Sequence, residues 1–299
     1  MPAKVTFTFG GERKQVSLEE AKDGSQRLEA LLADSSKVVT VMDLSCRQWT
    51  VETIGEMRPA LEKAAKTLEY LNVDDTIAGL QTDIGLAIME LWAQIFDGAT
   101  QTLQKITLND NAMGPRALER MRTLLRSPNL HTMKLNNCGL SAETIPVLDA
   151  ALKMSDDELG VPRLRSLSLD RNMIGEEGAR QVGLVLCDCV DMTAFSYAGC
   201  RPGDGGTKYI TKALRTLAEK GNAKLTDLNL HDCSFGNGEE DDHAIHDLKV
   251  ALDNLRQLKK LCLQDGGDLG EDGTGLICGA LKNSGAPLVD LDMSTSRSV

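Results

Sequence analysis

Polar side chains that could do chemistry recur at one place in a repeated pattern and do not assemble into a catalytic set. In the clearest copies, Asn or Cys stands three residues after an apolar-x-apolar stretch, at Asn111, Cys138, Asn172, Cys200 and Cys233. An amide or a thiol at that place can hydrogen-bond the backbone of a buried turn, whose polar groups need partners. The pattern therefore predicts a structural ladder of side chains and no active centre.

Two places carry residue types that can bind a metal or act as nucleophiles. His243 and His246 follow the acidic run 239–242, which is compatible with a metal site or with a solvated helix N-terminus. We favour the second interpretation, because carboxylates stabilise that end of a helix dipole. Cys187 and Cys189 form a C-x-C motif without the second pair that a zinc site needs. No Ser-His-Asp or Cys-His-Asn set can be assembled, so we expect no metal, no cofactor and no catalytic residue.

The spacing of apolar residues around the ladder positions predicts the strands and helices that hold them. The spacing apolar-x-x-apolar-x-apolar-x-x-[Asn/Cys]-x-apolar recurs nine times, and we call the last apolar residue before the Asn/Cys position the third anchor. The third anchors are Leu44, Val73, Leu108, Leu135, Leu169, Tyr197, Leu230, Leu263 and Met293. Apolar alternation predicts a short strand, and a repeat of about 31 residues leaves room for a helix on the return path. The predicted fold class is an α/β leucine-rich repeat solenoid, a horseshoe with a concave parallel sheet and convex helices.

Two segments add detail to this organisation. GPRALERMRTLLRS at 114–127 has the apolar periodicity of a helix. Residues 1–36 do not fit the repeat, and we expect them to form an N-terminal cap of a β-hairpin followed by a helix. That helix begins at the capping box Ser17–Glu20 and ends near Leu32. Residues 37–299 are expected to form about nine repeats, the last of them incomplete.

Composition narrows the class of partner. The formal net charge is −11, which argues against nucleic acid and anionic membranes as partners. There is no run of 18 apolar residues and no export signal at the N-terminus, so we expect a cytoplasmic protein with reduced cysteines. Leucine supplies 43 of the 299 residues and aromatic residues only 3%, which indicates a core filled by leucine. Acidic residues outnumber basic ones on the expected concave face, which favours a basic protein partner.

Two strings in consecutive repeats resemble a particular family. ITLNDNAMGPRAL (106–118) followed by MKLNNCGL (133–140) is similar to the leucine-rich repeat domain of the Ran GTPase-activating proteins. The resemblance covers roughly residues 37–295. It implies that Asn137 matches the family's functional asparagine and that Asp110 of the preceding repeat lies beside it and contacts the GTPase. It also implies a location in the cytoplasm, including the nuclear periphery.

The sequence departs from that family at one important position. The family carries a functional arginine just after a glycine, in the loop of the repeat before the first of these strings. Here Gly79 is followed by Leu80, and no arginine occurs between Arg58 and Arg116. Because a critical arginine contributes orders of magnitude to GTP hydrolysis, this replacement puts the activating function in doubt.

These observations predict a protein that binds a partner through its concave face, with a Ran-type small GTPase as the expected partner and no activity beyond regulating it. The expected contact residues are Asn137, Asp110, Asn136, Lys134, Asp170 and Arg171. One alternative is an active Ran activator that uses another basic residue, Lys105 or Arg116. Another is a general leucine-rich repeat scaffold in a cytoskeletal or ciliary assembly.

Overall fold

The computed structural model divides the chain into two compact units. The first consists of Met1–Cys138 and Ala150–Gly160, and the second of Gly139–Asp149 and Val161–Val299. The structure describes residues 2–153, 164–221, 224–236, 238, 244–267 and 269–294. Each unit repeats the order strand, turn, helix.

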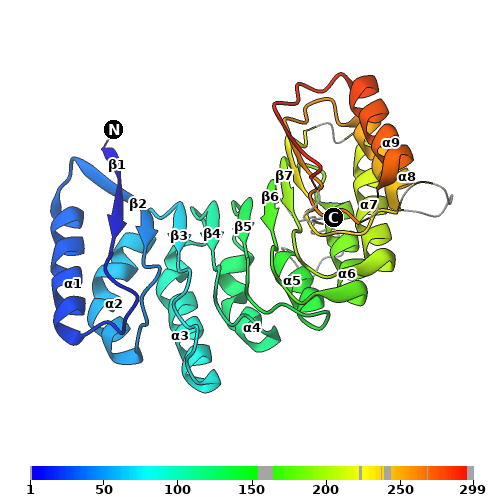
Figure 1. Cartoon of the computed structure of the whole chain (residues 1–299). Helices are drawn as coiled ribbons and strands as arrows, with labels where there is room; N and C mark the ends of the chain where they lie inside the picture. Colours follow the sequence, from blue (N-terminus) through cyan, green and yellow to red (C-terminus); the bar gives the residue numbers. More distant parts are fainter. Residues whose placement is uncertain are drawn as a thin grey trace. The chain divides into compact units, whose positions relative to one another are not determined.

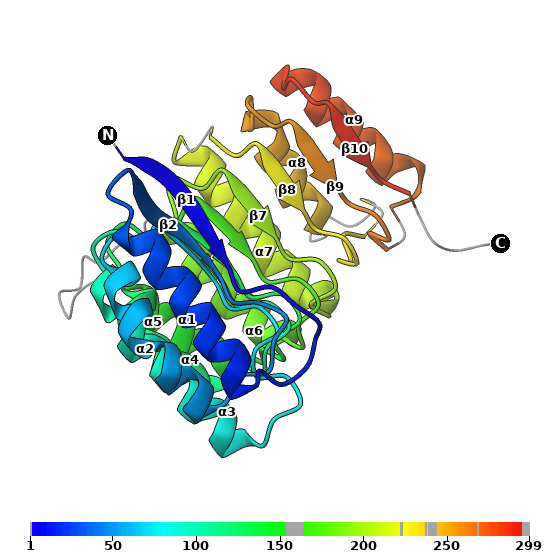
Figure 2. The same cartoon turned by 90° about the vertical axis from the view of Figure 1, so that its left-hand side faces the viewer.

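In the first unit, five strands pair in parallel in chain order, and the helices lie on one side of them (Figure 1). The view of Figure 2 shows β1 and β2 on one side and α1 on the other. The strands are β1 (Ala3–Thr8), β2 (Lys37–Asp43), β3 (Tyr70–Asn72), β4 (Lys105–Thr107) and β5 (Thr132–Lys134). The helices are α1 (Leu18–Ala33), α2 (Val51–Ala65), α3 (Thr82–Ile95), the 3-10 helix η1 (Phe96–Ala99) and α4 (Pro115–Leu125). Helix α5 (Thr144–Leu152) contributes residues to both units.

The second unit has the same construction. Strands β6 to β10 pair in parallel in chain order, and neighbouring helices pack on one another. The strands are β6 (Ser166–Ser168), β7 (Ala194–Ser196), β8 (Asp227–Asn229), β9 (Lys260–Cys262) and β10 (Asp290–Asp292). The helices are α6 (Gly175–Asp188), α7 (Gly203–Glu219), α8 (Ala244–Asn254) and α9 (Gly270–Ser284).

The predicted repeat spacing is confirmed. Each of the nine third anchors follows directly after the last residue of a strand, from Leu44 after β2 to Met293 after β10. In the three-residue strands β3 to β9 the middle side chain enters the core, as Leu71 and Ile106 do, whereas Leu291 of β10 is exposed. The residues that flank it point to the opposite face, because successive side chains alternate along a strand. The chain is therefore an α/β leucine-rich repeat solenoid with parallel strands and helical returns.

The N-terminal segment corrects one expectation. The predicted helix is present, since Ser17 caps α1 in a complete capping box with Glu20. The predicted hairpin does not form. Strand β1 pairs in parallel with β2, and residues 9–16 contribute only a parallel bridge between Gln15 and Gln48. The reason is topological: a helix placed between two strands is a crossover connection, which brings the strands together in parallel.

Aromatic residues are few, yet four of them are concentrated in the first unit. Phe9, Trp49, Trp92 and Phe96 form a continuous chain with ring centroids 4.7, 5.5 and 6.0 Å apart. All four are buried, and the Trp49 indole N–H donates to the Leu44 carbonyl. The rings come from three separate places in the sequence, so leucine alone does not fill this part of the core.

Candidate functional site

The turn after each of the strands β2 to β9 contains a residue in a left-handed conformation, two positions beyond the third anchor. Its φ lies between 52° and 63° in every case. These residues are Cys46, Asp75, Asp110, Asn137, Arg171, Gly199, Asp232 and Asp265. Asp, Asn and Gly adopt this conformation most readily, and they occupy all but two of these places. We call this set the turn row. Its recurrence two residues after each third anchor is a signal that the spacing analysis missed.

The turn row brings together the two residues that the family resemblance singles out. Asn137 Nδ2 donates to Asp110 Oδ1 over 2.8 Å, and both residues belong to the first unit. Asn137 is exposed and Asp110 half-buried. The two left-handed turns thus present a bonded amide and carboxylate at the edge of adjacent repeats. The left-handed backbone explains why Asn and Asp occupy these two positions. The exposure of Asn137 also allows the pair to contact a partner.

Residues one position earlier in the turn tie neighbouring repeats together. The Asp74 carboxylate accepts the backbone N–H of Asn109 over 2.7 Å, and Asn109 Oδ1 accepts that of Asn136 over 2.9 Å. In the second unit, Asp170 Oδ1 accepts the N–H of Ala198 over 2.9 Å. Burial raises the pKa of the Asp74 carboxyl, against the opposing effect of its hydrogen bonds to Asn109. Asn136 and Asp170, both expected contact residues, therefore lie in the part of the turn that stabilises the solenoid.

The other two expected contact residues lie in different units. Lys134 ends strand β5 of the first unit, is half-buried, and forms no ion pair with the described residues. Arg171 belongs to the turn row of the second unit, with a φ of 57°. An arginine is an unusual choice for the left-handed conformation, because its Cβ clashes there with its own backbone.

The ladder residues lie at the base of the turns, where each is buried. Asn111 is the most connected of them. Its Oδ1 accepts the N–H groups of Thr76 and Ile77, and its Nδ2 donates to the carbonyls of Val73 and Leu108, at 2.8 to 3.0 Å. A single side chain therefore satisfies backbone groups of two successive repeats.

Asn172 does the same in the second unit. It accepts the N–H of Leu140 over 3.1 Å and donates to the carbonyl of Leu169 over 2.6 Å. Asn172, predicted as a ladder residue, is thus a buried amide that hydrogen-bonds the backbone of its own repeat and of the preceding one.

The ladder cysteines act as hydrogen-bond donors. Cys138 Sγ donates to the Leu108 carbonyl over 3.1 Å, and Cys200 Sγ to the Leu169 carbonyl over 3.0 Å. Burial raises the pKa of both thiols to about 12 and raises that of Cys233 as well. A thiol held protonated is a poor nucleophile and a poor metal ligand. These cysteines therefore support the turns and carry no covalent chemistry.

Leu80, at the place where the resemblance calls for an arginine, lies beside a pocket of the first unit. We call it the loop pocket. Its walls come from the β3–α3 loop with the start of α3 (77–86) and from the β4–α4 loop with the start of α4 (112–117), and its volume is about 380 Å³. Leu80 is half-buried, directly after Gly79 with its φ of 78°. The pocket also includes Arg116, so the fold brings this arginine next to the loop from which one is missing.

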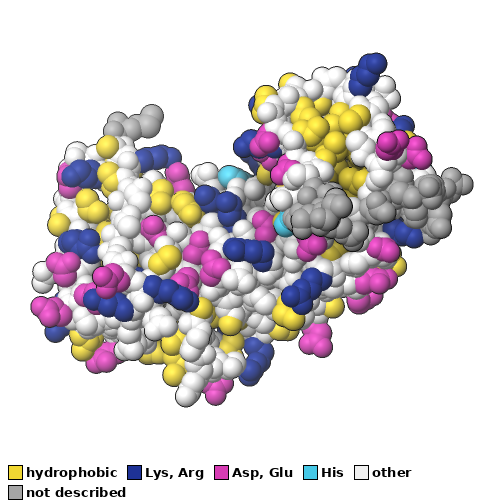
Figure 3. Space-filling model, viewed as in Figure 1, with side chains coloured by type: hydrophobic (Ala, Val, Ile, Leu, Met, Phe, Trp, Pro, Cys, Tyr) yellow, Lys and Arg dark blue, Asp and Glu magenta, His cyan; other side chains and the backbone are white. Residues whose placement is uncertain are grey.

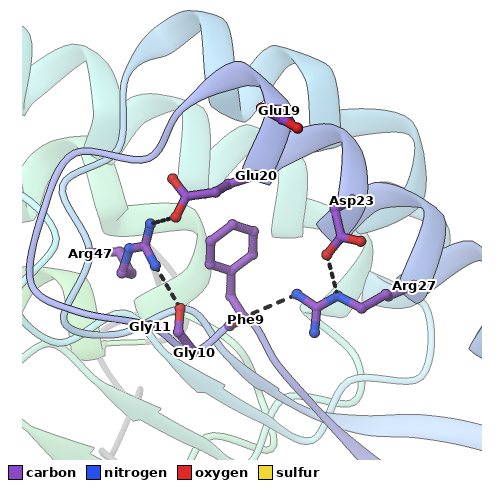
Figure 4. A pocket seen from close by; sticks show the side chains of 8 residues that line it. All are labelled: Phe9, Gly10, Gly11, Glu19, Glu20, Asp23, Arg27 and Arg47. Atoms are coloured by element: carbon purple, nitrogen blue, oxygen red, sulfur yellow. Dashed lines mark hydrogen bonds and ion pairs between the residues drawn. The ribbon is translucent and has the colours of Figure 1, made fainter.

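A second pocket lies between the N-terminal loop and α1, and Figure 4 shows its lining. Four of its five charged groups are paired with one another. Arg47 donates to the Gly10 carbonyl over 2.9 Å and to Glu20 over 2.8 Å, and Arg27 donates to Asp23 over 2.9 Å. These hydrogen bonds connect the N-terminal loop and α1 to Arg47, which precedes α2 in the chain. We therefore interpret the pocket as structural.

The two other places that the sequence raised as alternatives, the His243/His246 region and the C-x-C motif, gain no support from the described residues. No three His, Cys, Asp or Glu side chains of the described residues gather where they could hold a metal ion. The acidic run 239–242 and His243 lie outside the described residues. Cys189 is buried and donates to the Val185 carbonyl, while Cys187 is half-buried. In the part of the chain that the structure covers, no helix is long and apolar enough to cross a membrane.

The repeat spacing, the turn row and the ladder define the chain as a leucine-rich repeat protein. No protein-family model matches it. It is 27% identical to bovine NACHT, LRR and PYD domains-containing protein 3 (64% of this chain, 14% of the relative) and 27% identical to pig ribonuclease inhibitor (64% and 45%). It is 28% identical to the Ran GTPase-activating protein of Drosophila melanogaster (44% and 28%). The chain thus spans less than half the length of each of these relatives.

A solved structure also resembles it. An internalin from Listeria monocytogenes aligns over 94% of this chain and 85% of its own, with a TM-score of 0.43 and 13% identity.

Proposed function

We propose that this chain binds a Ran-type small GTPase through the turn row and strand face of its first unit. The observation that carries the proposal is the hydrogen bond between the exposed Asn137 and the half-buried Asp110. Both lie just after strands, within the two strings that resemble the Ran activators. The fly Ran GTPase-activating protein among its relatives supports the same choice. On the face drawn in Figure 3, acidic and basic side chains are interspersed over the first unit.

We further propose that binding occurs without strong activation. A Ran-type GTPase uses its own glutamine to orient the attacking water, and an added arginine stabilises the charge of the transition state by about 10³ to 10⁵ in rate. Leu80 supplies no charge in the loop where the family holds its arginine. Docking on Asn137 and Asp110 needs no such charge. The proposed location is the cytoplasm, including the nuclear periphery, which imaging of the tagged protein checks.

The test is single-turnover GTP hydrolysis on Ran with the unaltered protein and with Leu80→Arg, together with binding to both nucleotide states. We expect binding to the GTP-bound form with little stimulation by the unaltered protein, and stimulation by Leu80→Arg. Absence of micromolar binding to either state would overturn the proposal and leave a general scaffold as the function.

A second candidate function, an active Ran activator, is favoured by one specific observation. Arg116 lines the same pocket as Leu80, so a basic group is present beside the altered loop although it comes from the next repeat. The other candidate, Lys105, has its ammonium 4.0 Å from the Tyr70 ring centroid on the strand face. If the unaltered protein stimulates hydrolysis strongly and Arg116→Ala abolishes the effect, this second function replaces the first.

A further inference from the structure

The loop pocket has an apolar wall on each side. Ile77, Leu80 and Leu86 form one wall, and Ala112 and Pro115 belong to the other. Such a concave site with few polar groups is suited to an apolar side chain, whose transfer from water into it is favourable. A volume of about 380 Å³ accommodates one large side chain with part of the backbone that carries it.

A single charge distinguishes this pocket from a purely apolar one. Among the residues that line it, only Arg116 is charged. Arg116 is exposed and makes no ion pair or side-chain hydrogen bond with the described residues, whereas Arg120 and Arg122 of the same helix are paired with Glu90 and Glu119. The cation at the rim is therefore available to an anionic group from outside.

The position of Arg116 in α4 indicates that helix stability does not explain it. Arg116 is the second residue of α4, after Pro115, and the first turn contains no acidic residue. A cation at a helix N-terminus is unfavourable, whereas an anion is favoured there. A carboxylate brought to this rim would interact favourably with both the guanidinium and the helix dipole.

We propose that the loop pocket binds a short segment of a partner protein in which a Leu, Met or Phe side chain enters the pocket and an adjacent Asp or Glu pairs with Arg116. Shape selects the apolar residue, and charge complementarity selects the acidic one. The inference goes beyond the GTPase proposal, because it requires neither a nucleotide nor the Asn137–Asp110 pair. Leu80 completes the apolar wall that Ile77 and Leu86 also form.

The experiment is selection of random nonapeptides displayed on phage against four forms of the full chain. The forms are the unaltered protein, Leu80→Arg, Arg116→Glu and the control Lys22→Glu, which makes the same change of net charge on α1, far along the chain from the pocket. We expect the unaltered protein and Lys22→Glu to enrich peptides that pair a large apolar residue with a nearby Asp or Glu. Leu80→Arg should lose them, and Arg116→Glu should enrich basic partners in place of acidic ones.

The enriched peptide is then measured in solution. Its affinity for Arg116→Glu should be about tenfold weaker or more, which corresponds to about 1.4 kcal/mol, and methyl resonances of Leu80 and Ile77 should shift on titration. Arg116→Glu should fold normally, because it places a carboxylate in the first turn of α4. Enriched peptides without acidic residues, equal affinity for Arg116→Glu, no enrichment, or shifts confined to other methyl groups would each overturn the proposal. None of these outcomes depends on Ran.

Discussion

At the scale of single residues, asparagine and cysteine differ in the number and direction of the hydrogen bonds that they form at equivalent ladder positions. Asn111 both accepts from and donates to the backbone, so it connects two repeats with four hydrogen bonds of 3.0 Å or less. The Cys138 thiol can only donate to nearby carbonyls, and it is a weak donor. A buried turn whose ladder residue is asparagine therefore depends on that side chain more strongly than a turn whose ladder residue is cysteine.

This difference predicts the effect of truncation. Asn111→Ala should lower the free energy of unfolding by about 1 to 3 kcal/mol, since the N–H groups of Thr76 and Ile77 lose their acceptor in a buried place. Asn172→Ala should act in the same direction, and Cys138→Ala should cost less. Urea denaturation of the three variants measures these values. An unchanged midpoint for Asn111→Ala would show that the ladder assignment is wrong.

Asn137 allows its backbone role to be separated from its proposed contact with a partner. Asn137→Gly should keep stability, because glycine adopts the φ of 52° without strain. Asn137→Ala should be less stable by roughly 1 kcal/mol, because its Cβ is disfavoured in that conformation. Both should bind Ran more weakly than the unaltered protein. If Asn137→Gly binds Ran with full affinity, Asn137 is a turn residue only.

At the scale of elements, Glu20 joins the N-terminal strand and helix to the first repeat, whose third anchor is Leu44. It closes the capping box of α1 and accepts from Arg47, which also bonds the Gly10 carbonyl (Figure 4). The hydrogen bond from the Ser17 backbone N–H, followed by that from Arg47, lowers the pKa of Glu20 to about 2. The cap is thus fastened by a carboxylate that has to be ionised to hold both partners.

The lowered pKa predicts how stability changes with pH. A carboxylate whose pKa is lower in the folded state contributes stability above its unfolded value, about 4.3, and loses it as the pH falls towards 2. Between pH 4.3 and 2, Glu20→Gln should therefore lose less stability than the unaltered protein does. Glu19→Gln, in the same exposed first turn, is the matched control and should behave like the unaltered protein. Thermal melts at pH 7, 4 and 2.5 test this, and parallel curves for all three proteins would contradict it.

At the scale of the whole molecule, both units bury their cysteines in the same manner and expose one each. Cys46 of the first unit and Cys278 of the second are exposed. The buried thiols are Cys138, Cys189, Cys200 and Cys233. Accessibility of thiols therefore reports on the packing of both units at once, and no disulfide complicates it because all eight cysteines are free.

We expect native protein to react rapidly with maleimide at Cys46 and Cys278 and more slowly at the half-buried Cys187 and Cys262. The four buried cysteines should react only after denaturation, since burial protects them and raises their pKa values. Mass spectrometry of digests taken over time gives the order. Early labelling of Cys138 or Cys200 would contradict the packing of the turns.

Much of the architecture follows from local pattern alone. The nine third anchors, the helix that becomes α4 and the capping box at Ser17 were predictable, because a strand or a helix places apolar side chains at a fixed period within a few residues. The proximity of Asn137 and Asp110 was also predictable, since equivalent positions of adjacent repeats lie side by side. The hairpin was wrong because two short strand-like segments do not reveal which of them will find a parallel partner beyond a helix.

Tertiary structure decided the remainder. Three contacts depend on it: the chain of aromatic rings from Phe9 to Phe96, the ion pair of Arg47 with Glu20, and the shared pocket of Leu80 and Arg116. The residues of the last two pairs are at least 27 positions apart in the sequence. Such contacts depend on how one repeat stacks on the next. The repeat period in the sequence shows which repeats are neighbours, but it does not show which of their side chains come into contact. The repeat was therefore determined by the sequence itself, while the pocket that Leu80 and Arg116 line exists only through the packing of two loops.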